Sequence, residues 1–135
     1  MQNAINEALK CEIDVPVGCV IKLGDRIVAA AHNMREVDCD ITAHAEMLAI
    51  KAAQKVLNSS RLNECELYVT LEPCPMCAAA SAWAQIGRIV YGASDPKRGY
   101  SRFSPSLLHP KTEVSSGIMA DECGSVVSEF FMKKR

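Results

Sequence analysis

The sequence lacks several features, and each absence excludes a class of protein. It has no apolar run long enough to span a bilayer and no signal or transit peptide, so we expect a protein of the reducing cytoplasm with no membrane partner. No repeat, low-complexity tract or linker interrupts the 135 residues, and 49% of them are apolar, which predicts a single domain over residues 1–135. The net charge is only −1, and this neither requires nor excludes a nucleic-acid partner.

Two short segments contain the residues of a catalytic zinc site. The first includes His44 and Glu46, and the second places Cys74 and Cys77 at the proline-marked start of an expected helix. A structural zinc site is closed by four protein ligands, whereas a catalytic site uses three and leaves the fourth position open. Here the histidine and the two cysteines supply three metal ligands, and Glu46 can act beside the metal without binding it. The sequence therefore predicts one catalytic Zn²⁺ per chain.

Two other interpretations of these cysteines are open. The C-x-x-C pair alone could be a redox dithiol, but the chain has no thioredoxin-like pattern, and this hypothesis leaves the histidine and the glutamate without a role. A closed structural zinc site would need a fourth ligand, which Cys39 or Cys65 could supply. The cysteines outside the zinc motif are otherwise expected to be small core or near-core residues: Cys11, Cys19, Cys39, Cys65 and Cys123.

The order of expected elements indicates an α/β domain. Helices are predicted over residues 4–9, 43–57, 78–86 and 120–134. Strands are predicted over residues 17–21, 26–30, 64–71, 88–91 and 112–118, the first two forming a hairpin. The strand, helix, strand order from 64 to 91 implies parallel pairing with a right-handed crossover. We expect helices packed on a mixed sheet of about five strands, and an ordered, functional loop over residues 93–110.

Motifs along nearly the whole chain stand in the order and spacing of one family. They are Val15-Pro16-Val17-Gly18, Ala31-His32-Asn33, Thr42-Ala43-His44-Ala45-Glu46, Tyr68-Val69-Thr70-Leu71-Glu72-Pro73-Cys74, Tyr91-Gly92-Ala93 and Ala120-Asp121-Glu122-Cys123. In these motifs the chain resembles the bacterial tRNA-specific adenosine deaminases of the cytidine deaminase-like superfamily. The resemblance implies a three-layer α/β/α fold, zinc, a homodimer, and hydrolytic deamination of adenosine to inosine at the wobble position of a tRNA anticodon.

The resemblance also implies roles for individual residues. Asn33 and Ala45 would line the base pocket, and Asp95 would lie near the backbone of the target nucleotide; turn formation is the alternative role for the asparagine and the aspartate. Since zinc lowers the pKa of a bound water, Glu46 can take its proton and return it to the substrate as a general base and acid. Glu72 is interpreted as a structural carboxylate.

Basic and aromatic residues suit the binding of a single-stranded RNA loop, here the tRNA anticodon stem-loop. In residues 93–110, cations alternate with Tyr100 and Phe103. The segment 99–105 differs from the glycine-serine-leucine run of many family members, so their contacts cannot be transferred. A helix end with cations that match its dipole is the alternative for the carboxyl-terminal run. The expected RNA contacts are Lys97, Arg98, Arg102, Phe130, Phe131, Lys133, Lys134 and Arg135.

Three functions are compatible with these features: a tRNA adenosine deaminase, a small-molecule deaminase of the guanine or cytosine type, and a non-catalytic zinc-stabilised RNA-binding subunit. Glu46 argues against the last, because RNA binding does not need an unligated carboxylate beside a metal. The carboxyl-terminal aromatic and basic run argues against the second. Trp83, on the alanine-dense helix over residues 78–86, marks the expected dimer contact, unless that helix only packs on its own sheet.

Overall fold

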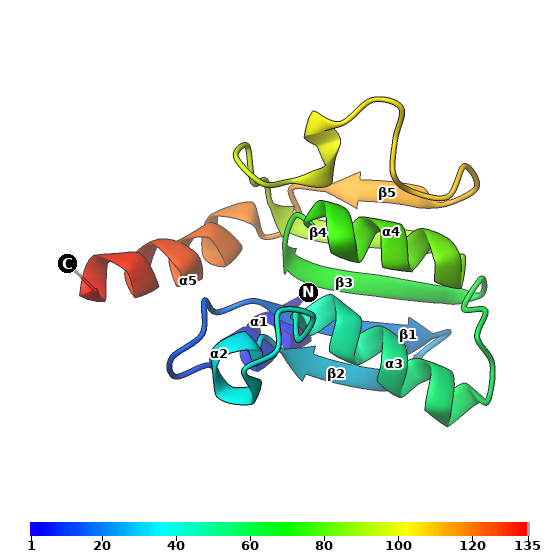
Figure 1. Cartoon of the computed structure of the whole chain (residues 1–135), viewed down its shortest axis with the longest axis horizontal. Coiled ribbons are helices and arrows are strands. Elements are labelled where there is room, and N and C mark those ends of the chain that lie inside the picture. The colour runs from blue at the N-terminus through cyan, green and yellow to red at the C-terminus, as the bar shows by residue number, and fades with distance from the viewer. Residues whose placement is uncertain (135) are drawn as a thin grey trace.

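A five-stranded mixed sheet forms the middle layer of the computed structural model, which describes residues 1–134 (Figure 1). The strand order is β2-β1-β3-β4-β5, with β1 antiparallel to both β2 and β3, and β4 parallel to both β3 and β5. The strands are β1 Gly18–Leu23, β2 Arg26–His32, β3 Cys65–Leu71, β4 Arg88–Ala93 and β5 Glu113–Ser116. The mixed sheet and the parallel pairing predicted from the sequence are confirmed.

Helices cover both faces of the sheet, which confirms the three-layer α/β/α arrangement. In Figure 1, α3 (Ala45–Leu57) and α4 (Pro75–Ala84) lie side by side in front of the strands. Helices α1 (Gln2–Ala8) and α5 (Ala120–Lys133) pack on the opposite face, α1 mainly on β1 and β2, and α5 on β3 and β4. A Cβ at Gly18 would collide with the Ala4 carbonyl oxygen, so glycine is needed where α1 meets β1.

The core lies between the sheet and the α3–α4 layer. Its large, fully buried side chains include Ile21 on β1, Leu67 and Val69 on β3, and Ile89 on β4, the three central strands of the sheet. Burying a side chain of this size stabilises the fold by about 1.5–3 kcal/mol.

Cys19, Cys65 and Cys123 are buried as expected and Cys11 is half-buried, but the expectation is wrong for Cys39, which is exposed.

Two short elements complete the described chain. Helix α2 (Arg35–Asp38), which the sequence analysis did not predict, ends at Cys39 in the left-handed region with a φ of 51°. The loop between β4 and β5 contains one turn of 3₁₀ helix, η1 (Tyr100–Arg102), as expected for an ordered loop. Of the helices formed by residues 1–134, none is sufficiently long and apolar to cross a membrane.

Candidate active site

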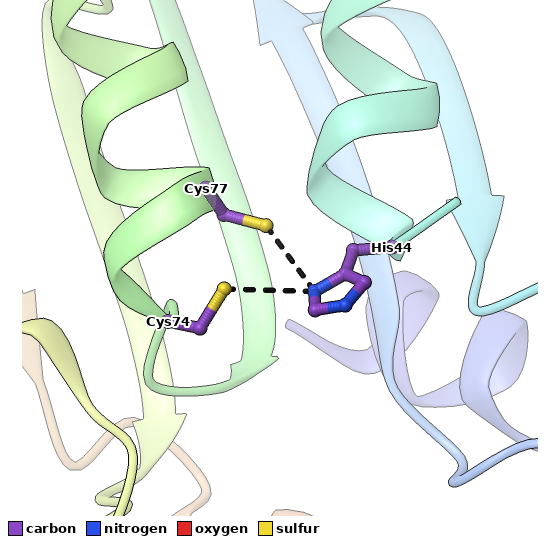
Figure 2. A group of neighbouring side chains, drawn as sticks. All are labelled: His44, Cys74 and Cys77. Atoms are coloured by element: carbon purple, nitrogen blue, oxygen red, sulfur yellow. Dashed lines mark hydrogen bonds between the residues drawn. The ribbon is translucent and has the colours of Figure 1, made fainter. Parts of the chain in front are cut away.

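The three predicted zinc ligands meet where α3 and α4 begin. His44 is the residue before α3 and Cys74 the residue before α4, both with extended backbone, and Cys77 lies in the first turn of α4. Figure 2 shows the imidazole of His44 pointing across the gap between the two helices toward both sulfurs. His44 Nδ1 is 3.6 Å from Cys74 Sγ and 3.5 Å from Cys77 Sγ. The strand β3 brings the cysteines to this position because α4 follows its carboxyl end.

The separations fit a tetrahedral zinc ion. With Zn–S bonds of about 2.3 Å and Zn–N bonds of about 2.05 Å, a tetrahedral angle places sulfur and nitrogen about 3.6 Å apart. The ligand atoms of His44, Cys74 and Cys77 all lie within 4.8 Å of one another, and this group includes neither Cys39 nor Cys65. Cys65 is the first residue of β3, whereas Cys74 follows the other end of that strand. At about 3.3 Å per residue, β3 alone separates them by ~20 Å. The residues therefore fit an open, three-ligand zinc site.

The side chains of the cluster are electrostatically matched to a cation. The hydrogen bond from Cys77, together with the neighbouring His44, lowers the pKa of the Cys74 thiol to about 4. The same bond raises the pKa of Cys77, because it is the group that keeps the shared proton. The hydrogen bond with Cys74 raises the pKa of His44. A thiolate is thus already favoured at Cys74, and a metal ion would take the place of the protons on the other two ligands.

Glu46 lies beside the cluster and outside it. It is in the first turn of α3, its side chain is 4% exposed, and it is not one of the grouped metal ligands. Burial raises its pKa to about 7, and Cys77 is among the side chains that contact it. A carboxyl group with a pKa near neutrality can both accept and donate a proton, which is the property expected of a general acid and base.

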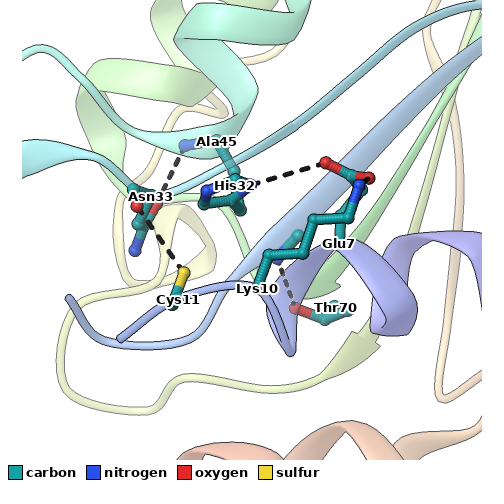
Figure 3. Close-up of polar contacts among 8 residues, drawn as sticks. Glu7, Lys10, Cys11, His32, Asn33, Ala45 and Thr70 are labelled. Carbon is teal, nitrogen blue, oxygen red and sulfur yellow. Dashed lines mark hydrogen bonds and ion pairs between the residues drawn. The ribbon is translucent and has the colours of Figure 1, made fainter. Parts of the chain in front are cut away.

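Asn33 connects the segment of Cys11 and Val15 to the start of α3, and Figure 3 shows its contacts with Cys11 and Ala45. Its amide oxygen accepts a hydrogen bond from the Ala45 N–H (2.8 Å), and its amide nitrogen donates to the Val15 carbonyl oxygen (2.9 Å). The Cys11 thiol donates to the Asn33 carbonyl oxygen at 3.5 Å. Asn33 thereby satisfies a free N–H at the start of α3. A side-chain amide has two donors and an acceptor oxygen with two lone pairs, so capacity remains for a base contact, which stays a prediction.

Asp95 shows the hydrogen bonds of a turn residue. Its Oδ1 accepts from the Lys97 N–H (3.3 Å) and from the Arg98 N–H (3.1 Å), which is the alternative considered for an aspartate before proline. A contact between Asp95 and the substrate stays a prediction.

Tyr100 is buried, with its ring edge-to-face against Tyr91 at a centroid distance of 6.2 Å, so the expectation that it stacks on an RNA base is wrong.

The expected RNA-binding side chains lie at the surface in two groups. Phe131 is 49% exposed, and Phe130 is partly buried beneath the ammonium of Lys134, 4.9 Å from the ring centre. Arg135 lies outside the described residues. The basic side chains that are exposed are Lys97, Arg98, Arg102, Lys133 and Lys134.

Asp14 supports the segment before His44, and the sequence did not predict this role. Asp14 is buried, and its carboxylate accepts hydrogen bonds from the Glu36 N–H (2.8 Å) and the Val37 N–H (3.4 Å) at the start of α2. It fixes the segment that precedes His44. The sequence offers no local signal for this contact, because Asp14 and Glu36 are 22 positions apart.

Comparison with known proteins agrees with this geometry. Residues 1–93 match the sequence model of the family described as the cytidine and deoxycytidylate deaminase zinc-binding region. The fold and the His44, Cys74 and Cys77 cluster thus define a zinc-dependent deaminase, a hydrolytic enzyme with one zinc ion per chain.

Similarity over the full chain identifies the branch of that class. A tRNA-specific adenosine deaminase of Bacillus subtilis (strain 168) is 45% identical over 142 aligned positions, which cover 100% of this chain and 88% of that protein. A solved structure from work on A-to-I editing by tRNA:A34 deaminases has a TM-score of 0.87 and 39% identity, covering 93% of this chain and 96% of that one. The chain belongs to the tRNA-specific adenosine deaminase family.

A guanine deaminase from Bacillus subtilis gives a weaker match. Its structure has a TM-score of 0.66 at 38% identity, and the match covers 69% of this chain and 61% of that one. The identity is similar, but the tRNA:A34 deaminase matches over more of both chains and superposes better. The small-molecule alternative is therefore not favoured.

Proposed function

We propose that this protein deaminates adenosine to inosine at the wobble position of a tRNA anticodon. The observation that carries the proposal is the three-ligand cluster with the buried, unligated carboxylate of Glu46 beside it, in a chain that belongs to the tRNA-specific adenosine deaminase family. A closed structural zinc site would have no use for this carboxylate. A redox dithiol would have no use for the histidine.

The side chains would share the chemistry as follows. His44, Cys74 and Cys77 would hold the zinc, which when bound supplies the Lewis acidity that makes a water molecule nucleophilic near neutral pH. Glu46 takes a proton from the attacking water and passes it to N1 of adenine as the water oxygen bonds to C6. It then takes the second proton from the new C6 hydroxyl and gives it to the amino group, so that the C6–N bond breaks and ammonia leaves. The Ala45 backbone and the Asn33 amide would line the base pocket. The target base must leave the stack to reach these groups.

The experiment that tests this function is a map of inosine in RNA. We expect the zinc-loaded protein to convert a wobble adenosine in an anticodon stem-loop to inosine and to release one ammonia per inosine. Stem-loops with adenosine only at other loop positions are the matched controls. Release of ammonia without inosine in the RNA would rule the function out.

Binding of the stem-loop should depend steeply on salt. If the exposed cations contact phosphates, each contact contributes a slope of roughly −0.7 to −0.9 to log K against log salt. Deletion of residues 133–135 should make that slope shallower by about 2 and leave zinc content unchanged. Lys22→Ala is a control on a different part of the surface. A binding constant that does not change with salt would contradict the proposed phosphate contacts; equilibrium titration measures it.

We propose that the protein assembles as a homodimer through α4. The buried side of this helix consists of Cys77, Ala78, Ser81 and Ala84, whereas Trp83 on its other side is 86% exposed. Exposure of the largest apolar side chain on a surface of small residues is costly unless a partner covers it.

Replacement of Trp83 with glutamate should convert the dimer to a monomer, because it places a charge in the proposed interface. Sedimentation at micromolar concentration measures the change, and Ile27→Glu on the β2 surface is the control that should remain dimeric. Wild-type protein that sediments as an active monomer would contradict the assembly.

We place the enzyme in the cytoplasm with its tRNA substrate. None of the seven cysteines, all of which lie among the described residues, is in a disulfide, which fits a reducing compartment.

A further inference from the structure

The loop after β4 is held by a buried carboxylate. Glu72 lies between β3 and Cys74, and it is 4% exposed. Its Oε1 accepts a hydrogen bond from the Asp95 N–H (3.1 Å). Its Oε2 accepts two more, from the Ser101 N–H (3.0 Å) and the Ser101 hydroxyl (2.7 Å). All three donors belong to residues 94–103, termed here the cationic loop because it carries Lys97, Arg98 and Arg102.

Backbone contacts hold the same two segments together. The Glu72 N–H donates to the Ala93 carbonyl oxygen (2.8 Å), and the Tyr100 N–H donates to the Pro73 carbonyl oxygen (2.9 Å). Leu71 and Ala93 are neighbours in the parallel pair of β3 and β4, so both strands end at the edge of the sheet where the zinc cluster lies. The cationic loop is therefore anchored next to the segment that carries Cys74.

Gly99 allows the loop to approach the carboxylate this closely. A Cβ at this position would collide with the Glu72 carboxylate and would lie 2.6 Å from the Asp95 carbonyl oxygen. Any other residue would push the loop away from Glu72. The close contact between the loop and the Glu72 carboxylate thus depends on glycine at position 99.

The three donors of the cationic loop replace the water that the Glu72 carboxylate loses on burial. They are the only hydrogen-bond partners of that carboxylate among the described residues. Among residues 1–134, no basic side chain forms an ion pair with Glu72. A buried carboxylate without partners is strongly unfavourable, and hydrogen bonds to a charged group are stronger than those between neutral groups. Detachment of the loop would remove all three donors to the Glu72 carboxylate at once, two backbone N–H groups and one hydroxyl, so the attached arrangement is strongly preferred.

We propose that Glu72 is a positioning residue for RNA binding, which fixes the cationic loop beside the zinc cluster before the RNA arrives. This inference rests on the proposed function, because it takes the anticodon stem-loop as the ligand. A loop that is already ordered loses less conformational freedom on binding, so its basic side chains bind phosphates more tightly. Loss of the anchor raises KM for the RNA and leaves kcat nearly unchanged, because Glu72 does not touch the reacting atoms.

The test replaces Glu72 with glutamine, which has the same size but presents an NH₂ group where Ser101 needs an acceptor. Hydrogen exchange of the Asp95 and Ser101 amides should accelerate by about tenfold to a hundredfold, as expected for lost hydrogen bonds to a charge. KM for the stem-loop should rise about tenfold with kcat within about twofold and zinc content unchanged. Glu66→Gln is the matched control on β3, because Glu66 is partly exposed and pairs with Arg88 (3.3 Å).

A milder variant covers the case in which Glu72→Gln does not fold. Ser101→Ala removes one hydrogen bond and should raise KM and amide exchange in the same direction by a smaller factor, whereas Ser101→Thr keeps the hydroxyl and should restore both. Unchanged exchange would show that Glu72 does not hold the loop. Faster exchange with an unchanged KM, or a loss of zinc or of kcat, would overturn the positioning role. Wild-type protein that leaves the stem-loop unmodified contradicts the proposed function separately, and the exchange measurement still decides whether the anchor exists.

Discussion

Replacement of Glu46 with alanine is expected to lower the deamination rate by about 10²- to 10⁴-fold and to leave about one zinc ion per chain. The rate falls because general acid–base catalysis by a positioned side chain contributes a factor of this size. The metal remains because the ligand atoms belong to His44, Cys74 and Cys77, and the carboxylate lies outside that group. Single-turnover deamination of the stem-loop measures the first effect, and metal analysis of the purified variant measures the second.

Glu122→Ala is the matched control, since it removes an exposed glutamate from the first turn of another helix, α5. It should keep both activity and zinc. Loss of zinc from the Glu46→Ala variant would mean that this carboxylate is a ligand. Full activity in the same variant would mean that another group moves the proton.

Replacement of Cys77 with serine should remove zinc, activity and part of the stability together. The serine hydroxyl is a weaker zinc ligand than the cysteine thiolate. Because Cys77 is only 1% exposed, a water molecule from solvent cannot easily take the place of the lost sulfur. A ligand at 1,000 times its dissociation constant stabilises a fold by about 4 kcal/mol. Loss of this linkage lowers the melting temperature by an amount on the order of 10 °C in a chain of this size. Metal analysis and thermal unfolding, with and without added zinc, measure the effect.

The control for this variant is Cys39→Ser, because Cys39 is exposed and outside the ligand group. It should keep zinc and its melting temperature. A chelator should lower the melting temperature of the wild-type protein and of Cys39→Ser equally, and it should have no effect on Cys77→Ser. A Cys77→Ser protein that retains stoichiometric zinc would contradict the three-ligand assignment.

The elements that hold the site could be predicted because their signals are local. Residues 65–71 have the texture of a buried strand, and the prolines directly after them mark the start of a helix, which places Cys74 and Cys77 at that helix end. Spacing alone does not bring His44 to the cysteines, since 30 residues separate it from Cys74. That contact was predicted from the motif, and the structure explains it by the two helices starting at the same edge of the sheet.

The parts that sequence analysis missed depend on contacts between distant residues. Helix α2 is four residues long and has no apolar periodicity; it forms where the buried Asp14 accepts its first N–H groups. Tyr100 stands between cations in the sequence, but Tyr91 supplies a ring for it to pack against, so it is a core residue. Glu72 was expected to be structural, yet only the folded loop shows that its partners are Asp95 and Ser101.

Competition between an RNA and a free base tests the central claim most directly. The zinc-loaded protein is mixed with equal concentrations of a wobble-adenosine stem-loop and of guanine, and inosine in the RNA is measured together with xanthine in solution. We predict inosine as the only product, at a rate that falls by at least about 10²-fold in Glu46→Ala. Xanthine formed at a comparable or faster rate, with the RNA unchanged, would contradict the account.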